Sequence, residues 1–439
     1  MSVSVEELKR RACEAIDKNR DKIIEIGESI FSEPELGYKE VKTAAKVKKI
    51  FDELGYEYED EVAITGVIAP LKGKETKARV AVMGELDAVV SPAHRCADKT
   101  TGAAHACGHN AMIAGLMGVA YALHGTGIME ELSGDIVLMA VPAEEYVEIE
   151  YRNNLRKEGK IHFLGGKQEF IRIGKMDDID MMIMQHLANV NDKGIKVIAN
   201  SGSNGFLGKL IQYKGKEAHS GGAPHLGINA LNAATLGLTA VHMQRETFQD
   251  KDHIRVHPII TKGGDLVNVV PADVRIETYI RGANVEAILD ADKKVTRAFK
   301  AGGDAVGAET IITDLPGYLP TVLEYGLMDV MYENLKTLYK EDEVLYEAEA
   351  GAGSTDVGDV SVIMPTMQSN FCAVTGDFHS KDFEITDKET AYINTAKGLV
   401  MTAIDLLANG AEKALEIKKN FKPQMTKEEY LRTWGKLDV

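Results

Sequence analysis

Apolar residues in the N-terminal part of the chain follow first a helical and then a strand-like spacing. They recur every three or four positions over residues 4–31, with Ser4 as the N-cap, and again over residues 41–55, which predicts two helices. Short β-rich runs bounded by glycine and charge follow at residues 65–73 and 78–89. These runs predict the first two strands of a sheet.

One strongly apolar helix and two further strands continue this pattern. The helix begins beside His109, and the strands cover residues 134–145 and 178–187. Strands that alternate with helices are typical of an α/β fold. We therefore expect an α/β sheet in this part of the chain.

The pattern changes over residues 206–314. Runs that alternate apolar and polar residues suit an antiparallel sheet with one solvated face. Together with two helices they give the order β-α-β-β-α-β, which is ferredoxin-like. The α/β pattern resumes afterwards, so we predict a small domain at 206–314, inserted into a discontinuous α/β domain formed by 1–205 and 315–439.

Charge and cysteine content exclude several classes of partner. The formal net charge of −16 disfavours nucleic acid and anionic membranes. The longest apolar run, residues 111–123, is shorter than the ~18–20 residues that span a bilayer. Four widely spaced cysteines do not form a disulfide framework, and the charged N-terminus has no signal-peptide core. We expect a cytoplasmic protein with no nucleic-acid or membrane partner.

Residues that commonly bind metals gather where strands end or a helix begins. Cys107 and His109 precede the apolar helix, Glu144 and Glu145 end a strand, and His186 ends another. His379 follows a further β-like run, and ligands collect at the carboxyl ends of strands in open α/β sheets. Thiolate, imidazole and carboxylate together suit zinc and its neighbours. Glu144 would then remain as a general base beside the metal.

Each of these residues also has an ordinary structural interpretation. A lone histidine is more often structural than a ligand, and Cys107 alone would be a small buried residue. A pair of adjacent glutamates is common on surfaces, and His219 and His379 taken singly would be loop residues. Only the Cys-Gly-His spacing at 107–109 is moderately specific, because it presents two ligands at a helix start. The residues alone leave a metal site and an ordinary fold about equally supported.

Longer motifs resemble the M20 metallopeptidase and amidohydrolase family, in particular its cysteine-bearing branch. These motifs are HACGHN at 105–110, PAEE at 142–145, GKEAHSGGAPHLGINALNAA at 215–234 and GGDLVNVVPADVRIETYIRG at 263–282. The resemblance extends from PELGYKE at 34–40 to HSKDF at 379–383, with the motifs in the family's order. That branch includes hydrolases of N-acyl amino acids, of auxin–amino acid conjugates and of aminobenzoyl-glutamate.

The resemblance implies a role for each matching residue. It implies a centre of two divalent metal ions, zinc or manganese, whose ligands are Cys107, His109, Glu145, His186 and His379. Glu144 resembles the general base, and Asp87 the aspartate that orients a metal ligand. His219 matches the histidine of the inserted lid domain that polarises the scissile carbonyl, in family dimers from a neighbouring subunit. Asn268 and Arg281 match lid positions that hold the carboxylate end of the substrate.

The resemblance also implies the overall architecture. It implies a mixed-sheet α/β metallohydrolase domain that carries a ferredoxin-like lid and forms a homodimer through that lid. Residues 252–260 are a candidate edge strand for pairing across the dimer axis. Asp356, in the glycine-rich segment GAGSTDVGDVS, either lies near the metals, where it would help to bind substrate, or caps a helix.

Three features depart from the family pattern. Glu85, in GELD at 84–87, stands where many relatives have aspartate or histidine. Asn110 stands where most members of the branch have aspartate, so we ask whether it alters the metal site. The stretch between Glu145 and His186 is longer than expected and contains Arg152 and GGKQE. We expect a solvated surface loop there; the alternative is a segment that shapes the substrate pocket or a subunit contact.

The favoured function is a metal-dependent amidohydrolase that cleaves a small N-acyl or aryl amino acid conjugate, with Glu144 as the base. A dipeptidase or carboxypeptidase would use the same site, and a hydrolytic deaminase of an amino-aromatic compound is a further alternative. A metal-dependent binding protein without turnover is the non-enzyme alternative. The presence of Glu144 argues against it, because a binding protein needs no spare base.

Overall fold

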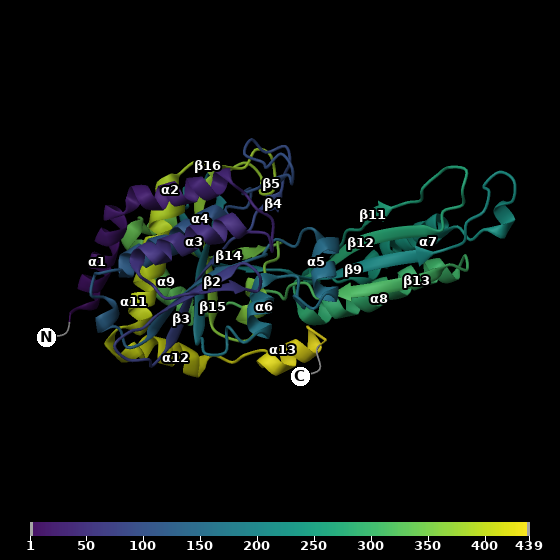
Figure 1. The fold of residues 1–439 in the computed structure, drawn as a ribbon. Helices are drawn as coiled ribbons and strands as arrows, with labels where there is room; N and C mark the ends of the chain where they lie inside the picture. Colours follow the sequence, from purple (N-terminus) through teal and green to yellow (C-terminus); the bar gives the residue numbers. More distant parts are fainter. Residues whose placement is uncertain (1–2, 437–439) are drawn as a thin grey trace. The chain divides into compact units, whose positions relative to one another are not determined.

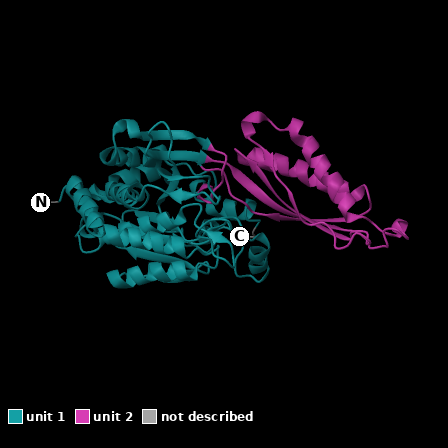
Figure 2. Cartoon of the chain, turned by 90° about the horizontal axis from the view of Figure 1, so that it is seen from above, with its two compact units in different colours: residues 1–202, 322–350, 359–439 teal, residues 203–321, 351–358 magenta. Residues whose placement is uncertain are grey.

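A computed structural model describes residues 3–436 of the chain, which divide into two compact units (Figure 2). Unit 1 comprises the described part of 1–202, 322–350 and 359–439, and unit 2 comprises 203–321 and 351–358. The sequence predicted an inserted domain at 206–314, whereas unit 2 extends to residue 321 and also takes up a short segment that lies 30 residues further along the chain.

Unit 1 is built on a nine-stranded mixed sheet (Figure 1). Its order is β1-β2-β6-β3-β7-β15-β8-β14, with β16 paired to β15. Strands β6, β3, β7 and β15 run parallel, whereas β1–β2, β2–β6, β15–β8 and β15–β16 are antiparallel. The mixed α/β fold predicted from the sequence is confirmed. The strands of this sheet and of the small β4–β5 pair are β1 (Glu59–Val62), β2 (Gly66–Leu71), β3 (Arg79–Glu85), β4 (Val89–Val90), β5 (Ala103–Ala104), β6 (Asp135–Val141), β7 (Met181–Asn189), β8 (Val197–Ser203), β14 (Val344–Gly351), β15 (Thr366–Thr375) and β16 (Glu384–Ile385).

The apolar helix predicted after His109 is the central helix of unit 1. All 15 residues of α4 (His109–Leu123) are buried, and it packs against β3 and against α1, α2 and α11. A helix that is apolar on every side needs such complete cover. The long helix predicted over 4–31 is instead two helices, because the backbone leaves helical geometry at Asn19. Two further α-helices pack on the sheet of unit 2 and are given below. The remaining α-helices are α1 (Val5–Lys18), α2 (Arg20–Ser32), α3 (Val41–Leu54), α5 (Ile149–Lys157), α6 (Gly166–Arg172), α9 (Tyr325–Leu338), α10 (Val357–Ser361), α11 (Thr395–Leu407), α12 (Glu412–Asn420) and α13 (Lys427–Thr433).

The stretch between Glu145 and His186 is not a solvated surface loop, so that expectation was wrong. It forms α5 and α6, and it buries the charged side chains of Arg152, Lys167 and Glu169. Buried charges are tolerated when they are paired and hydrogen-bonded. Here Lys167 forms an ion pair with Glu85, and Glu169 accepts hydrogen bonds from the His162 and Phe163 backbone and from Arg172. A polar composition therefore concealed a buried segment.

Unit 2 contains a five-stranded sheet in which each assigned strand pair is antiparallel. Its order is β10-β12-β9-β13, and β11 also pairs with β12. The two helices pack on this sheet and on each other around Tyr213, Val295 and Phe299. The elements are β9 (Gly205–Lys214), α7 (Ala230–His242), β10 (Arg255–Val256), β11 (Ile259–Lys262), β12 (Asp273–Gly282), α8 (Val285–Asp304) and β13 (Glu309–Leu315).

Short irregular helices complete the described chain. They are the 3-10 helices Met129–Glu131, Pro224–Leu226, Met243–Thr247, Asp250–Asp252, Glu341–Glu343 and Asn409–Ala411, and the π-helix Glu389–Asn394. Within residues 3–436, no helix combines the length and the apolar character that crossing a membrane requires.

Candidate metal centre

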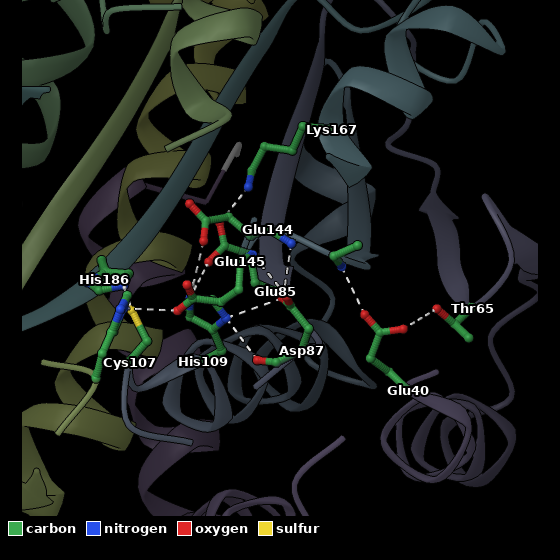
Figure 3. Close-up of polar contacts among 12 residues, drawn as sticks. Glu40, Thr65, Glu85, Asp87, Cys107, His109, Glu144, Glu145, Lys167 and His186 are labelled. Atoms are coloured by element: carbon green, nitrogen blue, oxygen red, sulfur yellow. Dashed lines mark hydrogen bonds and ion pairs between the residues drawn. The ribbon is translucent and has the colours of Figure 1, made fainter. Parts of the chain in front are cut away.

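The candidate metal ligands of unit 1 meet at one edge of the large sheet. Because β3, β6, β7 and β15 are parallel, their carboxyl ends lie together. Glu85 ends β3, Glu144 and Glu145 follow β6, and His186 lies in the last part of β7. The N-terminus of α4 brings Cys107 and His109 to the same edge (Figure 3).

Three groups of side chains there have donor atoms close enough to hold a cation. One is Cys107, His109 and His186, and a second is Cys107, Glu145 and His379. Within each group the donor atoms lie within 4.8 Å of one another. The two groups share the Cys107 thiol, so this arrangement can hold two ions side by side. The structure thus brings together all five side chains that the family resemblance implied as ligands.

Hydrogen bonds fix which nitrogen of each buried histidine is available. Nδ1 of His109 lies 2.9 Å from the carbonyl oxygen of Asp87, and Nδ1 of His186 lies 2.8 Å from the carbonyl oxygen of Leu187. A carbonyl oxygen only accepts, so each Nδ1 carries a proton and donates it. Nε2 is then the available donor atom in both rings, which is how metal-binding histidines are usually oriented.

Two facing atoms at the centre of the cluster, Oε2 of Glu85 and Nε2 of His109, are buried and have no hydrogen-bond partner besides each other. Nε2 of His186 lies 3.5 Å from Sγ of Cys107, and Nε2 of His379 lies 3.2 Å from Oε1 of Glu145. Buried polar atoms are rarely left without partners. A set of nitrogen, sulfur and carboxylate oxygen donors that converge in this way fits divalent cations such as zinc or manganese.

The protonation states of these residues reflect the excess of acidic groups. Burial opposes ionisation of Glu145, but the hydrogen bond and charge of His379 lower the pKa of Glu145 to about 2. Burial disfavours the charged His109 ring, yet Glu85 and Cys107 hold the pKa of His109 well above its usual value. Burial, reinforced by Glu145, raises the pKa of the Cys107 thiol. The cluster therefore attracts positive charge, which a divalent cation would supply.

The turn that carries Glu144 and Glu145 is held by two buried carboxylates. Asp87 accepts hydrogen bonds from the backbone N–H of Glu144 at 3.1 Å and from that of Glu145 at 2.9 Å. Glu40 accepts one from the N–H of Ala143 at 2.8 Å. Ala143 has a φ of 56°, a left-handed conformation that costs energy for a residue with a side chain. These contacts hold the turn in that conformation.

Glu144 lies beside the ligands without belonging to either group that contains Cys107. Its Oε2 is 3.9 Å from Nε2 of His109, and the residue is 8% exposed. Together with Glu85 and His109 it forms the third group of potential donors. A carboxylate in this position can exchange protons with a water molecule next to the ligands.

The other predicted site residues belong to unit 2. The loops that contain His219 and Asn268 lie side by side, because the Ser220 N–H donates to the Asn268 carbonyl at 2.9 Å. The Arg281 guanidinium donates to the Ser354 hydroxyl at 2.9 Å and lies over the rings of Phe206 and Tyr279. Asp356 is fully buried and directly precedes α10.

Asn110 belongs to none of the three groups of donor atoms. Its side-chain amide donates to the carbonyl oxygen of Gly27 in α2, at 3.1 Å, and lies 3.2 Å from the Tyr392 hydroxyl. Asn110 therefore contributes to helix packing. His105, the first histidine of the motif, is buried and belongs to none of the three groups; burial lowers its pKa to about 3.

Two residues close to the centre were not singled out from the sequence, and a third, Glu85, was noted there only as a departure from the family pattern. Glu40 holds Ala143, Glu85 lies 2.9 Å from His109, and Lys167 forms an ion pair with Glu85. Glu85 and Glu40 do occur in the motifs GELD and PELGYKE, which offered a signal for them. Lys167 lies in the stretch expected to be a surface loop, so no local pattern indicated its burial.

Comparison with known proteins gives a consistent result. Residues 81–404 match the sequence profile of peptidase family M20/M25/M40. The chain is 28% identical to an Xaa-Arg dipeptidase of Mus musculus, over 98% of this chain and 96% of that protein. It is 25% identical to an IAA-amino acid hydrolase of Arabidopsis thaliana, over 85% of this chain and 83% of that protein. A dinuclear metal-binding peptidase from Bacillus subtilis has a similar fold, with a TM-score of 0.64 and 20% identity over 89% of this chain and 99% of that one.

Proposed function

Because this chain belongs to peptidase family M20/M25/M40, and is thus a hydrolase acting on C–N bonds, we propose that it is a metal-dependent amidohydrolase whose general base is Glu144. The family resemblance drawn from the motifs is confirmed by the profile match. The observation that carries the proposal is the pair of donor groups that share Cys107, with the Glu144 carboxylate beside them. The dinuclear peptidase of similar fold supports two ions per chain.

Cys107, His109 and His186 would hold one ion, and Cys107, Glu145 and His379 the other. When bound, such ions polarise an amide carbonyl and lower the pKa of water. Glu144 takes a proton from the attacking water and passes it to the nitrogen of the scissile amide. The C–O bond forms, the C–N bond breaks, and the amine leaves with that proton. Asp87 holds the backbone of Glu144 and Glu145, so base and ligand keep a fixed spacing.

The roles proposed for residues of unit 2 are those that the family resemblance implied. His219 stabilises the developing oxyanion, and Asn268 and Arg281 bind the carboxylate end of the substrate. The Arg281 side chain is supported by Ser354 and by two aromatic rings, which favours a defined orientation. For Asp356, complete burial directly before α10 supports helix capping more than contact with substrate.

The substrate we propose is a small N-acyl or aryl conjugate of an amino acid, supported by the similarity to the plant IAA-amino acid hydrolase. One observation favours a second candidate, a dipeptide. The similarity to the mouse Xaa-Arg dipeptidase covers nearly the whole of both chains. The same donor groups and base serve both substrates, since each contains an amide next to a free carboxylate.

We also propose a homodimer that forms through unit 2, and a reducing compartment such as the cytoplasm. Strands β10 and β11 form an edge of the unit 2 sheet, and Ile259 and Ile260 there are 61% and 45% exposed. All four cysteines are free thiols, which suits a reducing environment.

The test is amine release from a pooled panel, followed by mass spectrometry. The panel contains N-acyl amino acids, aryl-amide conjugates and dipeptides, and the purified chain is supplied with Mn²⁺ or Zn²⁺. Glu144→Gln should lower kcat by about 10²–10⁴-fold while both ions still bind. Glu148→Gln serves as the matched control and should keep wild-type activity. Glu148 lies four positions after Glu144, and its carboxylate forms an ion pair with Lys39. A wild type that binds no divalent ion and releases no amine would refute the proposal.

A further inference from the structure

The carboxylate of Glu85 faces His109 inside the metal centre. Its Oε2 lies 2.9 Å from Nε2 of His109, and each residue is 1% exposed. Apart from this contact, neither of the two atoms has a hydrogen-bond partner. Glu85 is not among the five ligands that the family resemblance implied, so its place in the centre needs its own explanation.

The hydrogen bond on the far side of the His109 ring makes this contact informative. Nδ1 donates to the carbonyl oxygen of Asp87, so Nε2 is the ring nitrogen that faces Glu85. Donor atoms of Glu85, His109 and Glu144 lie within 4.8 Å of one another, so these side chains form a group that could hold a cation. Two donor atoms at ~2.1 Å from one ion are at most about 4.2 Å apart, so one ion can bind both atoms.

Lys167 fixes the orientation of this carboxylate. Its ammonium group forms an ion pair with the other oxygen of Glu85, Oε1, and Lys167 is completely buried (Figure 3). Because Oε1 is held by α6, Oε2 is directed to His109. The ammonium also offsets the additional negative charge in a cluster that already contains Glu144, Glu145 and Asp87.

We propose that Glu85 is a sixth metal ligand, bound through Oε2 to the ion that His109 holds, and that Lys167 is its positioning residue. This inference rests on the proposed function, because it requires the metal centre. It also explains the burial of the segment between Glu145 and His186, since α6 in that segment carries the Lys167 ammonium group that orients Glu85. An additional carboxylate oxygen should also shift the metal preference of this binding site toward manganese, which favours oxygen donors more than zinc does.

The test is a titration of the metal-free full chain with Mn²⁺ by isothermal calorimetry, with the bound metal counted after dialysis. We expect two Mn²⁺ ions per wild-type chain. Glu85→Gln should weaken one of them by more than about 100-fold, because loss of an orienting neighbour alone costs 10–100-fold. Lys167→Met should fall within that 10–100-fold range, and Lys167→Arg should restore most of the affinity. Repeating the titration with Zn²⁺ should give a smaller loss for Glu85→Gln.

A second ion pair of unit 1, in which the carboxylate is buried and the cation half-buried, provides controls. Asp135 is 1% exposed and lies 3.0 Å from Arg79, and neither residue belongs to the donor groups. Asp135→Asn and Arg79→Met make the same charge changes and should leave both Mn²⁺ affinities within about threefold of wild type. Circular dichroism of the metal-free proteins checks folding. If Glu85→Gln fails to fold, Glu85→Asp keeps the charge, withdraws the oxygen by one methylene and should weaken the same ion.

The outcomes separate this inference from the proposed function. If Glu85→Gln binds both ions with wild-type affinity, Glu85 is only an ion-pair partner of His109 and the inference is overturned. If the wild type then still releases amine, the hydrolase proposal stands. A wild type that binds no ion would refute both the inference on Glu85 and the proposed function.

Discussion

At the scale of single residues, Glu40 is the best test of how the turn that carries Glu144 and Glu145 is held. Its carboxylate accepts hydrogen bonds from the Ala143 N–H at 2.8 Å and the Thr65 hydroxyl at 2.7 Å. Glu40→Ala leaves the buried Ala143 N–H without an acceptor, and the turn that bears Glu144 can then move. A displacement of about 1 Å can cost 10²-fold in rate, so we expect kcat to fall by about 10–100-fold.

Glu40→Gln should keep near-wild-type kcat, because its amide oxygen can accept from Ala143 while its NH₂ donates to the Thr65 oxygen. Thr65→Val removes only the second hydrogen bond and is the matched control. Steady-state kinetics on a substrate from the release panel measures all three variants. Equal losses for Glu40→Ala and Thr65→Val would contradict a specific role for the Ala143 contact.

The same glutamate predicts a dependence of stability on pH. Burial, with the nearby Asp87 charge, raises the pKa of Glu40 from 4.5 to about 7. Its contribution to the free energy of unfolding is therefore full below about pH 4.5 and is lost as pH rises through about 7. The loss is of the order of 3 kcal/mol at about 1.4 kcal/mol per unit.

Urea unfolding of the metal-free protein at pH 5 and pH 8 measures this loss. Wild type should lose more unfolding free energy between the two values than Glu40→Gln, which has no proton to lose there. Identical losses in the two proteins would show that Glu40 does not titrate in this range.

Which site residues can be predicted from sequence depends on how local their signal is. Cys107 and His109 lie two positions apart at a helix start, and Glu144 and Glu145 end a strand, so a short window contains each pair. Glu85 and Lys167 are separated by 82 positions, and Glu40 and Ala143 by 103. Only the folded sheet brings such pairs together, and no periodicity in the chain marks them.

At the scale of elements, the segment that includes Gly37 and Tyr38 packs against the turn that carries Glu144 and Glu145. A Cβ placed on Gly37 would lie 2.2 Å from Nη2 of Arg152 and 2.9 Å from the Cα of Ala143. Arg152 in turn donates to the carbonyl oxygens of Ala143 and Leu164 and lies over the Tyr38 ring. The segment after α2, the turn after β6 and helix α5 thus pack against one another.

Gly37→Ala should therefore destabilise the protein by about 1–3 kcal/mol and lower kcat, because the turn and Arg152 must both shift. Gly353→Ala is the control, since a Cβ there would meet nothing within 4 Å. Thermal unfolding and kinetics on the two variants measure the effect. A Gly37→Ala protein as stable and active as Gly353→Ala would mean that the packing around position 37 accommodates a Cβ with no loss of stability or activity.

Elements with a strong periodic pattern could be predicted, and those that depend on partners could not. Helix α4 and the strands β3, β6 and β7 follow from apolar runs. Helices α5 and α6 carry Arg152, Lys167 and Glu169 inward, so their composition resembles that of a surface loop. Their burial is possible only because Glu85, Arg172 and backbone groups satisfy those charges.

At the scale of the whole molecule, the remaining question is whether two chains associate. An exposed sheet edge with apolar side chains is a ready site for pairing with another strand. In unit 2, β10 and β11 form one edge and β13 the other. The first edge carries Ile259 and Ile260, 61% and 45% exposed, and the nearby Val267 is 95% exposed. We therefore expect the wild type to sediment as a dimer.

Ile259→Lys should convert that dimer into a monomer, because a charge at the centre of the paired edge would be buried without a partner. Thr313→Lys adds the same charge to an exposed position on the opposite edge and should remain dimeric. Sedimentation velocity over a range of concentrations measures both. If His219 acts on the neighbouring subunit, kcat of Ile259→Lys should fall as the dimer dissociates. A monomeric variant with full activity would confine the action of His219 to its own chain, whereas a wild type that is monomeric at every concentration would remove the dimer itself.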